Sequence, residues 1–216
     1  MIKAVLFDMD GTVFDTEKIY YRSWVRAAEA VSFAGNMHDV MPLIFGVSET
    51  DIGQYFYENW GADFPYSRML SLRASFIAEE IERDGVPLKD GVPNVFCALA
   101  ERGVASALVS SAPRFRMDDF LTRTGLADSF SCIISGERVD KSTPAPDIFL
   151  LAAREMGLSP EECLVAEDSR NGVLAGYRAG MSVAMIPDLQ PYDASLSPCV
   201  TYLLTSLSQL PDCIDS

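Results

Sequence analysis

The chain has 216 residues, which is enough for one large domain or for a core domain with a smaller insertion. Its formal net charge of −14 and its lack of a Lys- or Arg-rich run argue against a nucleic-acid partner, because such partners need clustered cations. The single histidine, His38, excludes a zinc site built from histidines and lies in a polar stretch that we expect to be an exposed loop. Five cysteines form no CxxC pair, and no segment reads as a secretory signal or a membrane span. We therefore expect a cytoplasmic protein with no membrane partner, and the acidic, unpatterned surface favours a monomer.

The first strand-like segment ends in two carboxylates. Val5-Leu6-Phe7 reads as a buried strand, and Asp8, Asp10, Gly11 and Thr12 follow it. Period-two geometry sends Asp8 and Asp10 to the same side, where they repel each other unless a cation or a shared proton intervenes. An Asx turn would explain Asp10-Gly11 but not Asp8. The stretch therefore predicts a divalent metal ion at the end of a strand.

Residues 15–88 read as helices with no strand pattern between them. Apolar positions at helical spacing predict one helix after Thr16, a second that starts at Ser48 and a third from about Tyr66 to Arg83. The remainder of the chain alternates strands and helices. We therefore predict a helical domain, residues 15–88, inserted into a core made of residues 1–14 and 89–216.

From Gly91 onward, short strands alternate with helices. The pattern predicts helices at 95–101, 113–124, 146–156 and 172–179, strands at 104–109, 132–134, 163–166 and 183–186, and a weaker terminal helix near Leu207. Short connections between alternating elements mean right-handed crossovers and a parallel sheet. The predicted fold class is α/β, with a Rossmann-like doubly wound parallel sheet as its core and the all-helical domain inserted after the first strand.

Two later strand ends bring polar groups to the same crevice as Asp8, because the carboxyl ends of parallel strands share one edge of the sheet. Ser110-Ser111 ends one strand just before a helix, and hydroxyls beside a helix N-terminus suit a phosphate. Glu167-Asp168 ends another strand with a second pair of carboxylates. Four converging carboxylates require a hard cation, and oxygen ligands of this kind suit Mg²⁺.

Four segments resemble the four motifs of the haloacid dehalogenase superfamily of phosphotransferases. They are Asp8-Met9-Asp10-Gly11-Thr12, Ser110, Pro144-Ala145-Pro146-Asp147, and Glu167-Asp168-Ser169 with Gly172. Their order and spacing span nearly the whole chain and are most similar to the subgroup of beta-phosphoglucomutase and related sugar-phosphate and phosphoglycolate phosphatases. The resemblance implies that the helical insertion is a cap domain. It also implies a Mg²⁺-dependent phosphatase that hydrolyses a small phosphorylated metabolite, a sugar phosphate or a similar phosphomonoester.

The resemblance also implies residue roles that the chemistry supports. Asp8 would be the nucleophile that forms an aspartyl-phosphate, and Asp10 would protonate the leaving alcohol and later activate water. Mg²⁺ would be held by Asp8, the backbone carbonyl of Asp10 and Asp168, with Glu167 supporting it directly or through water. Ser110 would grip the phosphoryl oxygens. The candidate substrate-binding residues are Gly11, Thr12, Ser111, Glu17, Tyr20 and Glu49.

One departure from the family concerns positive charge. The family usually has a Lys immediately before the Pro-Ala-Pro-Asp stretch, and this chain has Thr143 there. Lys141 lies two residues upstream and could bring its ammonium to the same place, or it could be a loop surface residue. Arg114 or Arg138 could substitute for it. Without any such charge the transition state loses stabilisation, and the protein would be slow or inert.

A second departure lies in the helical domain. The mutase pattern places a His at Tyr20 and a phosphate-binding Arg at Glu49. Glu49 would repel a second phosphate, so a simple phosphatase is favoured over a beta-phosphoglucomutase-type mutase. Tyr20 and Trp24 could face the substrate, but helical spacing favours packing roles for both.

Three rival hypotheses are weaker than the phosphatase. Cys132 and Arg138 form the C-x5-R pattern of cysteine-dependent phosphatases, a weak signal, and Glu137 within it would repel phosphate. Thr143 would suit a family member that binds a phosphorylated metabolite without turning it over, although the intact carboxylates oppose this. A dehalogenase would need neither Mg²⁺ nor the acid Asp10.

Overall fold

The structure is a computed structural model that describes residues 1–44, 47 and 49–214. The chain divides into two compact units. One contains Met1–Asp15 and Val86–Ser216, and the other contains Thr16–Gly85. Each unit has its own apolar core, so each is described by itself. In the described part of the chain, no helix is both long and apolar enough to cross a membrane.

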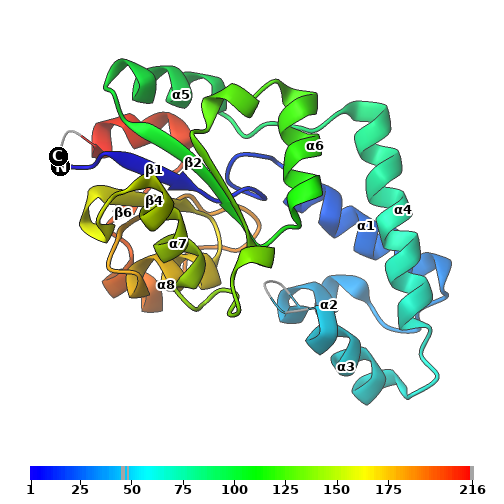
Figure 1. The fold of residues 1–216 in the computed structure, drawn as a ribbon. Coiled ribbons are helices and arrows are strands. Elements are labelled where there is room, and N and C mark those ends of the chain that lie inside the picture. The colour runs from blue at the N-terminus through cyan, green and yellow to red at the C-terminus, as the bar shows by residue number, and fades with distance from the viewer. Residues whose placement is uncertain (45–46, 48, 215–216) are drawn as a thin grey trace. The chain divides into compact units, whose positions relative to one another are not determined.

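The described strands of the first unit form one parallel sheet with the order β3-β2-β1-β4-β5-β6 (Figure 1). Their bounds are β1 (Ala4–Phe7), β2 (Ala105–Ser110), β3 (Cys132–Ser135), β4 (Cys163–Glu167), β5 (Ser182–Met185) and β6 (Tyr202–Leu203). Phe7 pairs with Leu108 on one side and with Ala166 on the other. Because the order reverses at β1, its carboxyl end opens into the crevice where such sheets bind ligands. The predicted doubly wound α/β fold is confirmed.

Helices cover both faces of this sheet. They are α5 (Val92–Glu101), α6 (Arg114–Thr124), α7 (Asp147–Met156) and α8 (Arg170–Arg178). Alternate strand residues such as Leu6 and Val109 pack in one cluster with α7 and α8, as period-two geometry requires. Phe7 points the other way, and its ring lies 5.3 Å from that of Phe96 in α5. Two-sided burial explains why these strands read as continuous apolar runs.

The second unit is helical in its described residues. It contains α1 (Glu17–Ala30), α2 (Met37–Ile44), α3 (Glu49–Trp60) and α4 (Tyr66–Asp84). Its core centres on Phe56, which is fully buried and stacks against Trp24 and Phe64 at ring distances of 6.3 and 4.9 Å. The three helical patterns predicted after residue 15 correspond to α1, α3 and α4. The predicted helix start at Ser48 lies outside the described residues.

The prediction of a loop around His38 was wrong, because this residue lies in α2. Met37, Val40, Met41 and Ile44 are buried at helical spacing, so the pattern was present. The helix is only eight residues long and contains Pro42, which weakens the signal. His38 is exposed, as expected, and its Nδ1 shares a hydrogen bond with the Tyr21 hydroxyl.

The tail also differs from its prediction. Residues Leu207–Cys213 form a 3₁₀ helix, η5, that contains Pro211, rather than an α-helix. The edge strand β6 was not predicted, because two residues are too few to show a period. The remaining 3₁₀ turns are η1 (Ala127–Ser129), η2 (Gly136–Arg138), η3 (Pro160–Glu162) and η4 (Ala194–Cys199).

Candidate active site

Asp8 is the first residue after β1, and the sheet still holds its backbone. Its N–H donates to the carbonyl of Ala166 in β4 over 3.0 Å. The chain then turns sharply: Gly11 has a φ of 87° and donates to Phe14, while Phe14 donates back to Met9 over 2.9 Å. A φ in this range favours glycine. The turn therefore places Asp8 and Asp10 on a loop at the crevice edge.

Asp8, Glu167 and Asp168 form a carboxylate cluster. One ligand oxygen from each lies within 4.8 Å of the others. Neighbouring strands explain the meeting, because β1 and β4 pair in parallel and end side by side. Burial raises the pKa of Asp8 well above its usual range, and the charges of Glu167, Asp168 and Asp10 raise it further.

Glu167 is held in place by the start of α8. Its Oε2 accepts hydrogen bonds from the Ser169 N–H at 2.8 Å and from the Ser169 hydroxyl at 2.9 Å. Burial nevertheless raises the pKa of Glu167 to about 7, although these hydrogen bonds oppose the shift. A Cβ at Gly172 would lie 1.6 Å from Glu167 Oε1, so only glycine leaves room for this carboxylate.

This donor set can hold a metal ion. Three carboxylates in one small volume repel one another, and this repulsion adds to the effect of burial in raising the pKa of Asp8. A hard cation with oxygen ligands would remove the repulsion. The structure thus brings together three of the four predicted metal ligands, while Asp10 adjoins them and contributes to the raised pKa of Asp8.

Ser110 ends β2 at the same edge of the sheet. Its side chain is buried, and its hydroxyl accepts a hydrogen bond from the Ala112 N–H at 3.1 Å. Ser111 is exposed. At the N-terminus of α6, the Arg114 N–H donates to the Glu137 carboxylate over 2.9 Å. One N–H group of the helix N-terminus that was predicted to suit a phosphate therefore already has a carboxylate partner.

Of the three candidates for the missing positive charge, Lys141, Arg114 and Arg138, the two arginines are paired with acidic residues. Arg114 contacts Asp118 at 2.9 Å, and Arg138 makes a two-pronged ion pair with Glu155. Burial also raises the pKa of the Cys132 thiol, which opposes the thiolate that the C-x5-R alternative needs. Lys141 is exposed between η2 and α7.

A further cluster at this edge was missed by the sequence analysis. Lys89 Nζ lies 2.8 Å from Asp188 Oδ1 and 3.6 Å from Asp15 Oδ1. The Asp188 side chain is only 7% exposed, and its Oδ2 has no hydrogen-bond partner among the described residues. Asp188 follows the end of β5, so the strand-end rule that selected Asp8 and Glu167 could have found it.

The remaining candidate residues differ in exposure. Thr12 is buried, and its hydroxyl has no hydrogen-bond partner among the described residues. In the helical unit, Glu17 begins α1, Tyr20 is half-buried and Glu49 is exposed at the start of α3. Trp24 belongs to the core of this unit. The Arg73 guanidinium lies 4.7 Å from the Trp24 ring and 5.5 Å from the Tyr20 ring.

The fold and the carboxylate cluster define a class of α/β protein with a helical insertion after the first strand of a parallel sheet. The sequence matches the haloacid dehalogenase-like hydrolase family over residues 5–186. The chain belongs to this family, and the resemblance found in its motifs is confirmed.

Three similar proteins have names that describe a hexitol phosphatase, a fructose-1-phosphate phosphatase and a phosphoglucomutase. The chain is similar to hexitol phosphatase B of Escherichia coli (strain K12), at 26% identity over 97% of this chain and 94% of the relative. It is 30% identical to fructose-1-phosphate phosphatase YqaB of the same organism, over 82% of this chain and 93% of the relative. It is also 28% identical to beta-phosphoglucomutase of Bacillus subtilis (strain 168), over 88% and 85% of the two chains.

Solved structures share the fold. A HAD family hydrolase from Deinococcus radiodurans R1, crystallised with bound phosphate and sodium, matches with a TM-score of 0.79 and 26% identity. The match covers 97% of this chain and 93% of that one.

Proposed function

We propose that the protein is a Mg²⁺-dependent phosphatase that hydrolyses a small phosphorylated metabolite, a sugar phosphate or a similar phosphomonoester. The observation that carries the proposal is the convergence of Asp8, Glu167 and Asp168 oxygens within 4.8 Å, with Asp10 beside them. Such a cluster serves no packing purpose, because burial of several like charges is costly.

Asp8, Asp10 and Asp168 would hold Mg²⁺, with Glu167 in support. When bound, the ion would neutralise charge on the incoming phosphate and on the Asp8 carboxylate. It would also keep Asp8 ionised, which the raised pKa of this carboxyl in the metal-free cluster otherwise opposes.

In the proposed reaction, an Asp8 oxygen attacks phosphorus while the bond to the leaving oxygen breaks. Asp10 gives its proton to the leaving alcohol. Asp10 then takes a proton from water, whose oxygen attacks the aspartyl-phosphate and releases inorganic phosphate. Asp8 returns as a carboxylate and Asp10 regains its proton, so one water is consumed for each phosphomonoester. Ser110 and backbone N–H groups near it would hold the phosphoryl oxygens.

The names of the relatives support a sugar phosphate as the substrate class. Glu49 supports a phosphatase over a mutase, because its exposed carboxylate stands where the mutase pattern has a phosphate-binding Arg. Lys141 is our candidate for the missing cation. A family member that binds the metabolite without turnover is the alternative, and Thr143 is the observation in its favour.

The test is phosphate release from p-nitrophenyl phosphate and a panel of sugar phosphates, with Mg²⁺ and with EDTA. Asp8→Asn should lower turnover by at least about 10³-fold, because it removes the nucleophile. It should not lower the unfolding midpoint, because it also removes one of the charges that repel each other. Asp128→Asn, at an exposed site, is the matched control and should keep full activity. Substantial turnover by Asp8→Asn would remove Asp8 as nucleophile, and conversion of glucose 1-phosphate to glucose 6-phosphate would favour the mutase.

A further inference from the structure

The strand β3 ends in a serine that the proposed reaction does not use. Ser135 is the last residue of β3, and the parallel pairing with β2 places it opposite Ser110. Ser135 is buried, with 1% of the residue exposed. Because parallel strands end at one edge of the sheet, Ser135 lies beside the loop that follows β2, which is the loop proposed to bind the phosphoryl group.

Two serine hydroxyls hold the backbone of Ala112 in this loop. The Ala112 N–H donates to the Ser110 oxygen over 3.1 Å, and the Ser135 hydroxyl donates to the Ala112 carbonyl over 2.8 Å. The Glu137 carboxylate is a second acceptor for Ser135, but it lies farther away, at 3.2 Å. A hydroxyl has one proton, so the shorter contact to Ala112 receives it. This bond satisfies a buried backbone carbonyl.

The Ser110 hydroxyl is thereby oriented for a ligand. Its oxygen accepts from Ala112, which leaves its own proton available, and no acceptor in the described part of the chain takes that proton. A phosphoryl oxygen is a strong acceptor for such a proton. The direction of the Ser110 O–H depends on Ala112, and the orientation of the Ala112 backbone depends on Ser135.

The η2 turn that follows Ser135 packs directly against the same loop. A Cβ at Gly136 would lie 2.9 Å from Ser111 Cα and 3.1 Å from the Ser111 carbonyl oxygen, so a side chain at this position would displace the loop. The next residue, Glu137, accepts a hydrogen bond from the Arg114 N–H at 2.9 Å. Three consecutive residues at the end of β3 therefore fix the loop between β2 and α6.

We propose that Ser135, with the η2 turn that follows it, is a positioning residue for phosphoryl binding and acts through Ala112 on the Ser110 hydroxyl. The inference rests on the proposed function, which assigns Ser110 to the phosphoryl oxygens. Loss of the Ser135 hydroxyl would leave the Ala112 carbonyl buried without its donor. The loop would then shift to satisfy this carbonyl, and the Ser110 hydroxyl would lose its fixed direction.

The test is calorimetric titration of the full chain with inorganic phosphate in excess Mg²⁺, which measures binding without turnover. Ser135→Ala should weaken phosphate binding at least about fivefold, because it removes a buried hydrogen bond that orients the site. In a Ser110→Ala background, the same substitution should weaken binding less than about twofold, because the hydroxyl through which Ser135 acts is already absent. A purely structural role would give the same loss in both backgrounds.

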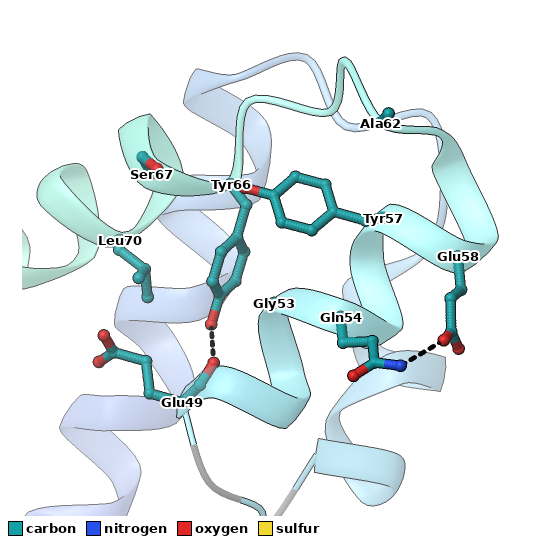
Figure 2. A pocket seen from close by; sticks show the side chains of 9 residues that line it. All are labelled: Glu49, Gly53, Gln54, Tyr57, Glu58, Ala62, Tyr66, Ser67 and Leu70. Carbon is teal, nitrogen blue, oxygen red and sulfur yellow. Dashed lines mark hydrogen bonds between the residues drawn. The ribbon is translucent and has the colours of Figure 1, made fainter.

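Two control variants remove a hydroxyl that donates to a backbone carbonyl elsewhere. Ser131 precedes β3 at the end opposite to Ser135, and its hydroxyl donates to the Ser106 carbonyl of β2 over 3.0 Å. In the helical unit, the hydroxyl of the buried Tyr66 donates to the Glu49 carbonyl over 3.0 Å, as Figure 2 shows. Ser131→Ala and Tyr66→Phe should leave phosphate affinity unchanged.

Unchanged phosphate affinity in Ser135→Ala would overturn the inference. So would equal losses in Ser131→Ala or Tyr66→Phe, or a full fivefold loss in the Ser110→Ala background. If Ser135→Ala failed to fold by circular dichroism, Gly136→Ala would decide the outcome, because it displaces the loop but keeps the Ser135 hydroxyl: it should weaken phosphate binding, and unchanged affinity would overturn the inference. Wild-type protein that binds no phosphate would overturn the proposed function as well, whereas the other outcomes overturn the inference alone.

Discussion

At the scale of single residues, Gly172 shows how a small side chain can define an acidic site. The start of α8 lies so close to β4 that Glu167 Oε1 occupies the space of a Cβ at this position. Ser169 completes the arrangement: its hydroxyl donates to Glu167 and accepts from the Gly172 N–H at 3.1 Å. The carboxylate orientation is therefore determined by the helix cap.

Gly172→Ala should lower Mg²⁺ affinity by about tenfold or more, because supporting contacts of this kind contribute that much to metal sites. The added methyl group must displace Glu167 or the first turn of α8. Calorimetric titration with Mg²⁺ measures the change.

Gly125→Ala is the matched control for this experiment. Gly125 has a φ of 69°, and a Cβ added there would meet no atom within 4 Å, so alanine costs stability through backbone strain alone, about 1 kcal/mol. It should leave Mg²⁺ affinity unchanged, and equal affinities in both variants would refute the role of Gly172.

Lys141→Ala tests whether Lys141 supplies the positive charge that the reaction at Asp8 needs. If Lys141 replaces the family lysine as proposed, its loss should lower kcat by at least about tenfold, because it would stabilise charge in the transition state. Lys18→Ala, another exposed lysine, should not change kcat. Unchanged turnover in Lys141→Ala would reject the assignment.

At the scale of elements, the candidate site is a set of strand ends. β1, β2, β4 and β5 are followed or ended by Asp8, Ser110, Glu167 and Asp188 at one edge of the sheet. Asp188, which follows β5, is connected through Lys89 to the two chain segments that border the helical insertion. The Lys89 N–H donates to the Val13 carbonyl, and its ammonium reaches both Asp15 and Asp188. One lysine thus connects three separate parts of the first unit.

Lys89→Met should reduce the free energy of unfolding by about 3 kcal/mol, because it leaves Asp188 buried without its countercharge. Urea unfolding followed by circular dichroism measures this loss. Arg123→Met breaks an exposed pair with Asp119 and should cost less than about 0.5 kcal/mol. Similar losses of unfolding free energy in the two variants would show that the buried Lys89 pair stabilises the fold no more than an exposed pair does.

At the scale of the whole molecule, metal binding should be coupled to pH. Without metal, burial raises the pKa of Glu167 from 4.5 to about 7, so between these values the folded chain holds a proton that the unfolded chain has released. The contribution of this group to the free energy of unfolding is therefore greatest below about pH 4.5, and it is lost as the pH rises through about 7.

Mg²⁺ should therefore stabilise the protein more at pH 8 than at pH 6. At pH 6 the ion must displace the Glu167 proton, so its apparent affinity should rise roughly tenfold between the two pH values. Thermal unfolding with Mg²⁺ and with EDTA at both pH values measures the difference. A Mg²⁺-dependent shift in Tm that is larger at pH 6 would contradict this coupling.

The sequence by itself determined the fold class and the main acidic residues. Apolar runs of strand length followed at once by Asp8, Ser110 or Glu167 carry that information locally, because strand period and strand ends are read from neighbouring residues. The same rule applied after β5 would have selected Asp188. The buried pattern of α2 was also readable, although Pro42 obscured it.

Only the tertiary structure decided which charges meet. Lys89 and Asp188 are far apart in sequence but lie 2.8 Å apart, whereas Arg114 and Arg138 are each paired with a nearby acid. Spacing along a chain gives no distance between residues on different loops. Likewise, the raised pKa values of Asp8 and Glu167 arise from burial, which depends on the packing of β1, β4 and α8 rather than on any local pattern.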